Sequence, residues 1–172
     1  KAGYEVIVHM PMENTGKTYG EEEFVLTTEM DNETIQRRVN TAFNQIPTAI
    51  GMNNHQGSSA SADQRVMSSV ARVMNERNLF FVDSRTTVET IAETTMEVFG
   101  VPTARRNVFL DNDDDEEKIT EQFMKLVKKS EELGSAIGTG HVKQKTLNVL
   151  KKHIPELQKK GFKFEFVSKM LH

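Results

Sequence analysis

The chain has 172 residues, a length at which one domain with a sizeable buried core is the default. Its composition of 37% hydrophobic and 27% charged residues is typical of a globular protein, and a net charge of −3 argues against a nucleic-acid partner. No apolar run approaches the length that spans a bilayer. The absence of cysteine excludes disulfides, thiolate nucleophiles and Cys-ligated zinc within this chain. It is compatible with an extracytoplasmic location, periplasmic or secreted, which we expect.

Strand-like and helix-like segments alternate along the chain. The strands are short apolar runs, whereas the helices repeat apolar side chains at a spacing of three or four, several of them behind an acidic or amide cap. Strict alternation predicts parallel strands joined by right-handed helical crossovers. In chain order we expect strand Tyr4–Val8, a polar loop over 15–28, a helix from Asp31 or Asn32 to Pro47, strand Thr48–Met52, a helix from Asp63 to Asn78, strand Leu79–Val82, a helix from Val88 to Gly100, strand Asn107–Leu110, a helix over 111–133, strand Ser135–Thr139, a helix from His141 to Gly161, and strand Phe162–Val167.

Three of the five histidines stand where a predicted strand stops, namely His9, His55 and His141. Ligand sites of parallel α/β proteins lie at this end of the strands, where the loops converge. Neutral imidazole nitrogens of His9 and His55 could bind a divalent metal, with Glu13 as an oxygen ligand. Each histidine could instead bond a loop carbonyl, and Glu13 could be a solvated acid. Both interpretations stay open.

Asp83 and Arg85 directly follow the third predicted strand. An Asp at the end of a strand with an Arg nearby suits the orientation of a catalytic base or the stabilisation of an oxyanion. The alternative is a turn that leads into the next helix, in which Asp83 and Thr86 or Thr87 act as caps.

The acidic run Asp111–Glu117 superficially resembles a calcium-binding loop. It lacks the glycine at the sixth position and the glutamate at the twelfth, where Glu116 and Gln122 stand. Carboxylates at the N-terminus of a helix explain the run, so we expect it to be structural. Arg105 and Arg106 precede a predicted strand and are therefore expected on the opposite, structural face.

Several sequence blocks stand in order across nearly the whole chain: Val8–Glu13 (VHMPME), Gly51–Ser58 (GMNNHQGS), Phe80–Thr86 (FFVDSRT), Gly100–Asp111 (GVPTARRNVFLD) and Ala136–His141 (AIGTGH). Together they resemble the divergent polysaccharide deacetylase family. The resemblance implies a distorted (β/α) barrel of the glycoside hydrolase/deacetylase type. It also implies hydrolysis of N-acetyl or O-acetyl groups on sugars by a metal-bound water, in the context of the bacterial cell envelope.

The resemblance transfers to individual residues unevenly. The family's His-Ser-x-x-His motif reads HMPME from His9 to Glu13, so His9 matches and Glu13 replaces the second histidine. His141 matches the histidine that the family uses as general acid, and His55 is proposed as a substitute ligand on spatial grounds. The family also carries an Asp-Asp pair on its first strand, which nothing before Tyr4 can provide. We therefore expect the opening strand–helix units, with the base and one ligand, to lie outside this chain.

These observations predict a single, partial polysaccharide-deacetylase-like domain over residues 1–172. The predicted function is a metal-dependent hydrolase, with zinc as the expected ion and an acetylated polysaccharide or amino sugar as substrate. The alternative is a non-catalytic carbohydrate- or peptidoglycan-binding domain on the same barrel. The sequence does not indicate which sugar is bound, or the oligomeric state. The assigned residues are His141, Asp83 and Arg85 as catalytic residues, and His9, His55 and Glu13 as metal ligands.

Overall fold

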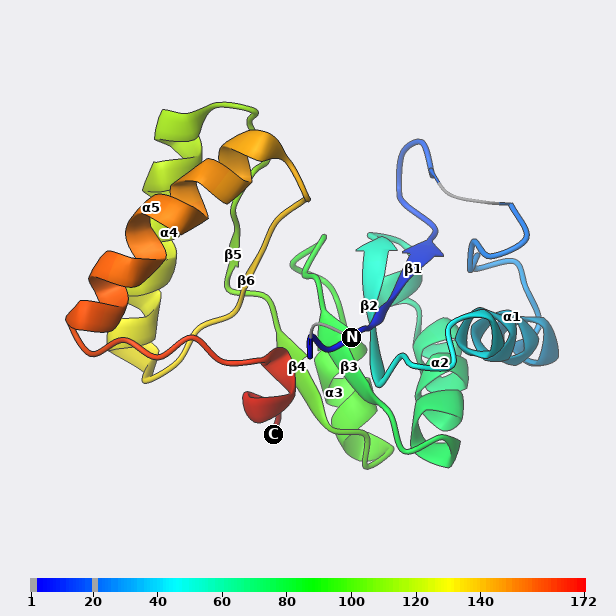
Figure 1. Ribbon diagram of the computed structural model, residues 1–172. Helices are drawn as coiled ribbons and strands as arrows, with labels where there is room; N and C mark the ends of the chain where they lie inside the picture. Colours follow the sequence, from blue (N-terminus) through cyan, green and yellow to red (C-terminus); the bar gives the residue numbers. More distant parts are fainter. Residues whose placement is uncertain (1–2, 20–21) are drawn as a thin grey trace. The chain divides into compact units, whose positions relative to one another are not determined.

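The structure is a computed structural model that describes residues 3–19 and 22–172. The sequence predicts one domain, within which the chain forms two compact units. The first comprises Lys1–Arg105 with Leu171–His172, and the second comprises Arg106–Met170. In Figure 1 the first unit holds α1 to α3 with β1 to β4, and the second holds α4 and α5 with β5 and β6. Each unit is described by itself.

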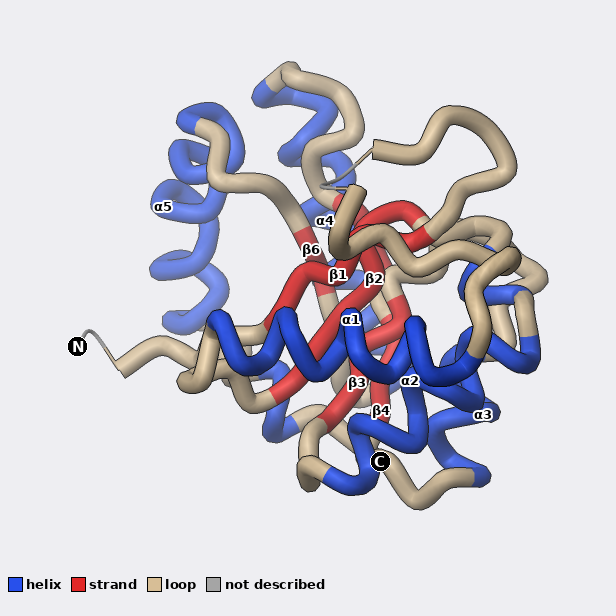
Figure 2. Tube along the Cα trace, turned by 90° about the vertical axis from the view of Figure 1, so that its right-hand side faces the viewer, coloured by secondary structure: helices blue, strands red, loops and turns tan. Residues whose placement is uncertain are grey.

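The first unit is built on a parallel four-stranded sheet with the order β1-β2-β3-β4. Helices follow the first three strands along the chain, and Figure 2 shows α1 crossing in front of the sheet. Parallel strands joined by helices confirm the predicted α/β class. The elements are β1 (Val8–Met12), α1 (Asn32–Gln45), β2 (Gly51–Gln56), the short 3-10 helix η1 (Ala60–Ala62), α2 (Gln64–Glu76), β3 (Phe80–Asp83), α3 (Ala92–Val98) and β4 (Thr103–Arg105).

One face of this sheet packs with the helices to form an apolar core. Side chains of successive strand residues point to opposite faces, so the register fixes which residues share a face. His9 pairs with Asn53 in the β1–β2 register, and His55 follows two residues later. These polar side chains therefore lie on the face opposite to the core. The core residues on the strands are Met10, Met12, Met52 and Phe81, and the helices contribute Ile35, Val39, Phe43, Val66, Val70, Met74 and Met96.

Local capping places the helices of the first unit where the sequence predicts them. The side chain of Asp31 accepts a hydrogen bond from the Thr34 backbone N–H at 2.7 Å, and Asp63 accepts one from Val66 at 2.8 Å. The bond from Thr34 holds the pKa of the Asp31 carboxyl below its usual value. The predicted caps are thus confirmed, because a cap needs only residues three positions away.

The first two strands begin later than the sequence predicts. β1 includes His9 and Pro11, and β2 continues past Met52 to Gln56. Pro11 is tolerated because β1 stands at the end of the strand order. Its carbonyl accepts from the Leu26 N–H at 2.9 Å, so the position of its missing N–H faces the outer side, away from β2. His9 and His55 therefore lie within strands, near their ends, and not after them.

The polar segment over 15–28 is a loop as predicted, although residues 20–21 lie outside the described residues. It returns to the sheet at Leu26, which forms a single parallel bridge with Met12. The guanidinium of Arg38 on α1 donates to the carbonyls of Glu22 and Val25, both at 2.6 Å. Backbone carbonyls that no strand partner satisfies are thereby bonded by a helix side chain.

Two further boundaries differ from the predictions. α3 begins at Ala92, not at Val88, whose side chain is 88% exposed and belongs to no apolar helix face. A strand not foreseen, β4, ends at Arg105 and pairs this residue with Asp83. The expectation that Arg105 precedes a strand on the opposite face is therefore wrong. The apolar run that suggested a strand at Asn107–Leu110 corresponds only to β5 (Val108–Phe109).

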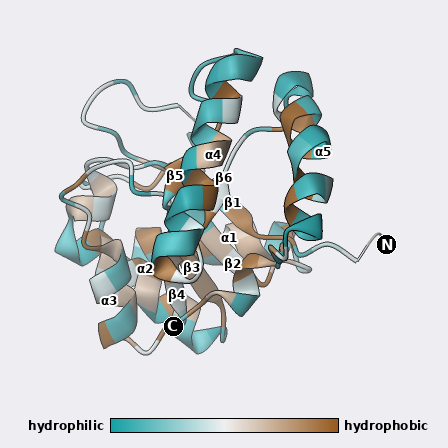
Figure 3. Ribbon diagram, turned by 90° about the vertical axis from the view of Figure 1, so that its left-hand side faces the viewer, coloured by the Kyte–Doolittle hydropathy of each residue, from teal (hydrophilic) through white to brown (hydrophobic). Residues whose placement is uncertain are grey.

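The second unit consists of two helices and two short parallel strands. β5 and β6 (Gly138–Thr139) form a parallel pair, and α4 (Glu116–Leu133) and α5 (Gln144–Lys159) enclose an apolar cluster that includes Ile119 and Phe123. Figure 3 shows teal and brown alternating around α4 and α5, as expected of helices with one apolar face. Gly134, at φ +82°, ends α4 as predicted.

The predicted last strand, Phe162–Val167, is not formed in the described residues. The backbone N–H of Phe162 instead donates to the Leu157 carbonyl at 3.1 Å, and the 3-10 helix η2 (Val167–Lys169) follows. Alternating side chains predict an extended shape, whereas a strand also requires a neighbouring strand. The described strands form one four-stranded and one two-stranded sheet and not a single closed ring. None of the described helices has the length and apolar composition needed to cross a bilayer.

Candidate functional site

The rings of His9 and His55 meet at the loop-bearing end of the first unit's sheet. Nε2 of His9 lies 3.0 Å from Nδ1 of His55, and the ring planes are inclined by 71°. The parallel register brings them together, because His9 stands beside Asn53 and His55 is the next residue on the same face. The two predicted ligands are therefore neighbours, with one ring nitrogen of each directed at the other.

A network of buried amide and hydroxyl groups is hydrogen-bonded to the His9 ring of this pair. Nδ1 of His9 is 2.9 Å from Oδ1 of Asn53, whose Nδ2 donates to Oγ of Ser84 at 3.1 Å. Ser84 donates in turn to the Asn54 carbonyl at 2.7 Å. The Asn54 side chain accepts from the Ser84 N–H at 2.8 Å and donates to the Gln56 carbonyl at 2.7 Å. Asn53, Asn54 and Ser84 are all buried, so this network is shielded from solvent.

Glu13 does not join the histidine pair. Its Oε2 accepts hydrogen bonds from the backbone N–H of Thr28 at 2.6 Å and from the Thr28 hydroxyl at 2.7 Å. Among the described residues, no group of three His, Cys, Asp or Glu side chains is arranged to hold a metal ion. The predicted set of His9, His55 and Glu13 is therefore not assembled. Two imidazole nitrogens suit zinc and similar ions, but a catalytic zinc site uses three protein ligands.

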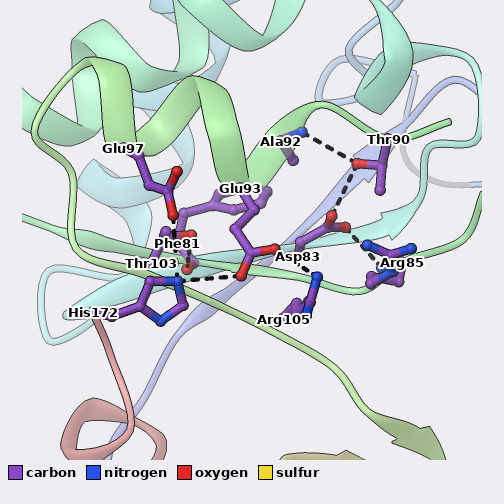
Figure 4. Close-up of polar contacts among 10 residues, drawn as sticks. All are labelled: Phe81, Asp83, Arg85, Thr90, Ala92, Glu93, Glu97, Thr103, Arg105 and His172. Atoms are coloured by element: carbon purple, nitrogen blue, oxygen red, sulfur yellow. Dashed lines mark hydrogen bonds and ion pairs between the residues drawn. The ribbon is translucent and has the colours of Figure 1, made fainter. Parts of the chain in front are cut away.

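Asp83 is the last residue of β3, just before the turn that leads into α3. Its side chain is completely buried, and its Oδ1 accepts from the Arg85 backbone N–H at 2.7 Å while Oδ2 accepts from the Thr90 hydroxyl at 2.9 Å. Figure 4 shows these bonds and the Thr90 hydroxyl, which also accepts from the Ala92 N–H at 3.2 Å. Arg85 has a φ of +46°, which the bond to Asp83 helps to hold. These contacts favour the structural alternative for Asp83. Thr90, and not the predicted Thr86 or Thr87, bonds the first residue of α3, whose N-cap is Ile91.

A charged cluster that the sequence analysis missed lies on α3 and β4. Glu93 contacts Nε2 of His172 at 3.2 Å and the guanidinium of Arg105 at 3.3 Å, and Glu97 lies 3.5 Å from the same histidine nitrogen. Figure 4 shows the side chains of His172 and Arg105 directed at Glu93, with Glu97 beside the same histidine. His172 also exchanges two backbone hydrogen bonds with Thr103, at 3.1 and 3.0 Å. No local sequence pattern predicts the contact between Glu93 and His172, because the two residues are 79 positions apart.

In the second unit His141 is paired with a buried carboxylate. Nδ1 of His141 lies 3.0 Å from Oδ1 of Asp111, and its backbone N–H donates to Oδ2 of the same residue at 2.7 Å. The Thr146 hydroxyl donates to Oδ2 at 2.8 Å. Asp111 is 1% exposed, whereas the His141 side chain is 54% exposed. The segments just after β5 and just after β6 thus build a dyad whose histidine remains accessible.

The protonation of Asp111 follows from these contacts. Burial raises the pKa of its carboxyl, but the hydrogen bonds from Thr146 and from the backbone and ring of His141 outweigh burial, and the pKa lies below its usual value. An ionised Asp111 keeps the proton of His141 on Nδ1. The expectation that the whole run from Asp111 to Glu117 is a helix N-terminus is therefore wrong for Asp111. It holds for Asp115, whose side chain accepts from the Lys118 N–H at 3.0 Å.

The surroundings of His141 are apolar and aromatic. Its ring makes an edge-to-face contact with Phe109 at 5.4 Å, and the guanidinium of Arg106 lies 4.7 Å from the centre of the Phe109 ring. His141 also lines a cavity of about 1010 Å³ in the second unit, whose walls come from α4, the segment around β6, α5 and the segment after α5. Leu126, Leu150 and Phe162 are among them.

Comparison with known proteins places this architecture in a family. A family model described as divergent polysaccharide deacetylase matches residues 1–171. The chain belongs to this family. The match confirms the resemblance drawn from the sequence blocks.

Two curated relatives of this divergent polysaccharide deacetylase chain are described only as uncharacterized. A protein of Haemophilus influenzae is 35% identical over 157 residues, and YibQ of Escherichia coli K12 is 34% identical over 156 residues. The alignments cover 90% and 91% of this chain but 56% and 49% of those proteins. The chain therefore spans about half the length of the curated relatives it matches.

A solved structure shows the same fold. The crystal structure of the uncharacterized protein ATU2773 from Agrobacterium tumefaciens C58 superposes with a TM-score of 0.93. The match covers 98% of this chain and 69% of that chain, at 21% sequence identity. The likeness shows the parallel α/β fold for this chain.

Proposed function

We propose that this chain contributes the metal-binding pair of a hydrolase that removes acetyl groups from a polysaccharide or amino sugar. The observation that carries the proposal is the 3.0 Å approach of His9 Nε2 and His55 Nδ1 at the end of a parallel sheet, in a chain of the divergent polysaccharide deacetylase family. A divalent ion held there, zinc by preference, would supply Lewis-acid chemistry at the acetyl carbonyl. An extracytoplasmic location, with a cell-envelope sugar as substrate, is part of the same proposal.

His141 is the proposed general acid. Because the ionised Asp111 accepts the proton of Nδ1, Nε2 is the nitrogen that can take up and release a proton at the substrate. Its partly exposed ring suits transfer to a leaving amine or alcohol. Asp83 and Arg85 contribute by shaping the turn before α3, since both oxygens of Asp83 are bonded within it.

The alternative function is non-catalytic binding of a carbohydrate or of peptidoglycan on the same fold. It is favoured by one observation, namely that Glu13 bonds to Thr28 and leaves the described residues with two ligands at the histidine pair. Fold alone does not decide between the two functions.

Release of acetate from acetylated amino-sugar oligomers distinguishes the functions. The protein is first treated with a chelator and then assayed with and without added zinc or cobalt, alongside His9→Ala. Release that requires the metal and is lost in His9→Ala is the expected result. Binding of the oligomers without release, whether or not metal is present, would establish the alternative. Release that persists without metal would contradict the proposed chemistry.

A further inference from the structure

The orientation of the Asn53 amide is determined by its neighbours. A carbonyl oxygen only accepts hydrogen bonds, so the single hydroxyl proton of Ser84 is committed to the Asn54 carbonyl, 2.7 Å away. Ser84 Oγ must then accept from Asn53, which requires the NH₂ group of the amide at 3.1 Å. The Asn53 oxygen is consequently the atom that faces His9.

This orientation selects one tautomer of His9. Oδ1 of Asn53 can only accept, so the ring nitrogen 2.9 Å away, Nδ1, carries the proton. In the neutral ring, Nε2 then has a lone pair and no proton. That lone pair faces Nδ1 of His55 at 3.0 Å. A chain of hydrogen bonds from the Asn54 carbonyl to the His9 ring therefore presents Nε2 as an acceptor.

We propose that Asn53, oriented by Ser84, is a positioning residue that holds His9 as the Nδ1–H tautomer and presents the Nε2 lone pair as a metal ligand. The proposal rests on the metal-binding role given to His9 above, and it assigns to Asn53 and Ser84 a task beyond the packing of the sheet. A histidine ligand is ordinarily fixed by a hydrogen bond from its other ring nitrogen, and loss of such a partner costs about 10–100-fold in metal affinity.

The position of both residues supports a role specific to His9. Asn53 is 9% exposed and stands beside Val82, in the middle of the sheet, so its amide is largely removed from solvent and depends on protein partners for its hydrogen bonds. Ser84 is fixed independently, because its N–H donates to the Asn54 side chain at 2.8 Å. Both ends of the buried Asn53 amide are hydrogen-bonded: its nitrogen bonds to Ser84, and its oxygen bonds to His9.

Histidine ring nitrogens can be observed directly by long-range ¹H–¹⁵N correlation spectra of the full chain, recorded without metal at alkaline pH so that the rings are neutral. We expect wild-type His9 to show a protonated Nδ1 and an unprotonated Nε2. Asn53→Ala should lose this preference and bind zinc about 10–100-fold more weakly. Asn53→Asp keeps an oxygen acceptor and should restore the Nδ1–H tautomer. The matched control is Asn75→Ala, which removes an amide bonded to the Phe99 carbonyl at 2.9 Å and should change neither reading.

The outcomes separate this inference from the proposed function. A wild-type His9 protonated on Nε2, or an unchanged tautomer in Asn53→Ala, would overturn the positioning role even if zinc binds. The expected tautomers without any zinc binding by the wild type would support the positioning role and overturn the proposed metal site. If Asn53→Ala does not fold, the wild-type spectrum and Ser84→Ala, which frees the amide to turn, still decide the question.

Discussion

The two units each place a histidine near the end of a strand, but they give the ring nitrogens different partners. In the first unit, Nδ1 of His9 meets the neutral amide of Asn53, and Nε2 meets a second imidazole. In the second unit, Nδ1 of His141 meets the carboxylate of Asp111. An amide oxygen beside Nδ1 accepts the ring proton there, so the Nε2 lone pair of a neutral ring is directed outward, as metal ligation requires. A carboxylate beside Nδ1 also accepts the proton there and leaves Nε2 as the nitrogen that can exchange a proton, as general acid–base chemistry requires.

The chemistry of each histidine therefore depends on the partner of its Nδ1 atom, and not on its position near the end of a strand. Ser84 sets the orientation of Asn53, and Thr146 with the backbone of His141 sets the ionisation of Asp111. Removing the histidines or their partners one at a time tests this difference between the two units.

The largest effect is expected for His141→Ala. If His141 is a general acid, its loss should lower turnover on acetylated amino-sugar oligomers on the order of 10²–10⁴-fold. Zinc affinity should stay unchanged, because the dyad with Asp111 is a separate contact set. Steady-state kinetics with a parallel zinc titration would measure both. Equal turnover in the wild type and the variant would show that His141 is a loop histidine.

His9→Ala and His55→Ala should affect metal binding. Each removes a candidate ligand, so zinc affinity should fall by at least the roughly 10–100-fold that loss of an outer-shell partner costs. Competition with a chromogenic chelator gives the dissociation constants, and elemental analysis gives the metal content. His153→Ala serves as control, because His153 lies on α5 against Phe123. Metal content undiminished in both variants would refute the assignment of the pair.

Asp111→Asn should lower the stability of the second unit by about 1–3 kcal/mol at neutral pH, because a buried charged acceptor with three hydrogen bonds is replaced. The pKa of Asp111 is lowered in the folded chain, so its contribution is present above the unfolded value of 3.8 and is lost as the pH falls through the lowered pKa. Urea unfolding at several pH values measures this.

The wild type should therefore lose part of its advantage over Asp111→Asn below pH 3.8. Asp113→Asn, at an exposed acid of the same run, is the control and should be nearly neutral. A stability difference between wild type and Asp111→Asn that does not depend on pH would contradict the ionised dyad.

The smallest effect is expected for Glu13→Gln. The amide can still accept from Thr28, so stability should change by about 0.5–1.5 kcal/mol at most, and zinc affinity should not change. Thermal unfolding and the same chelator competition test this. A marked drop in zinc affinity with intact stability would return Glu13 to the ligand set.

Local sequence signals predicted that the helices exist, whereas the bounds of strands that contain polar residues were predicted wrongly. The caps Asp31, predicted as Asp31 or Asn32, and Asp63 act over three residues, so local sequence is enough to predict them. β2 was cut short at Met52 because Asn53, Asn54 and His55 do not form an apolar run, although they complete the strand. These polar residues build the candidate site, so the same feature that carries function concealed the strand.

Contacts between distant residues were beyond the sequence. Asp111 stood in an acidic run and was indistinguishable from its neighbours, yet it is the one buried under His141. The roles of Asn53 and Ser84 required the β2–β3 register, which no local pattern specifies. The histidines themselves could be singled out because each stands near the end of an apolar run.

The most direct test of the difference between the two histidine sites is a zinc titration of the full chain, followed by long-range ¹H–¹⁵N spectra of the histidine rings. We expect zinc to shift the signals of Nε2 of His9 and of a ring nitrogen of His55, while Nδ1 of His141 stays protonated and the His141 signals stay in place. A titration in which His141 responds and His9 and His55 do not would contradict the assignment of ligand chemistry to the first unit and proton-transfer chemistry to the second.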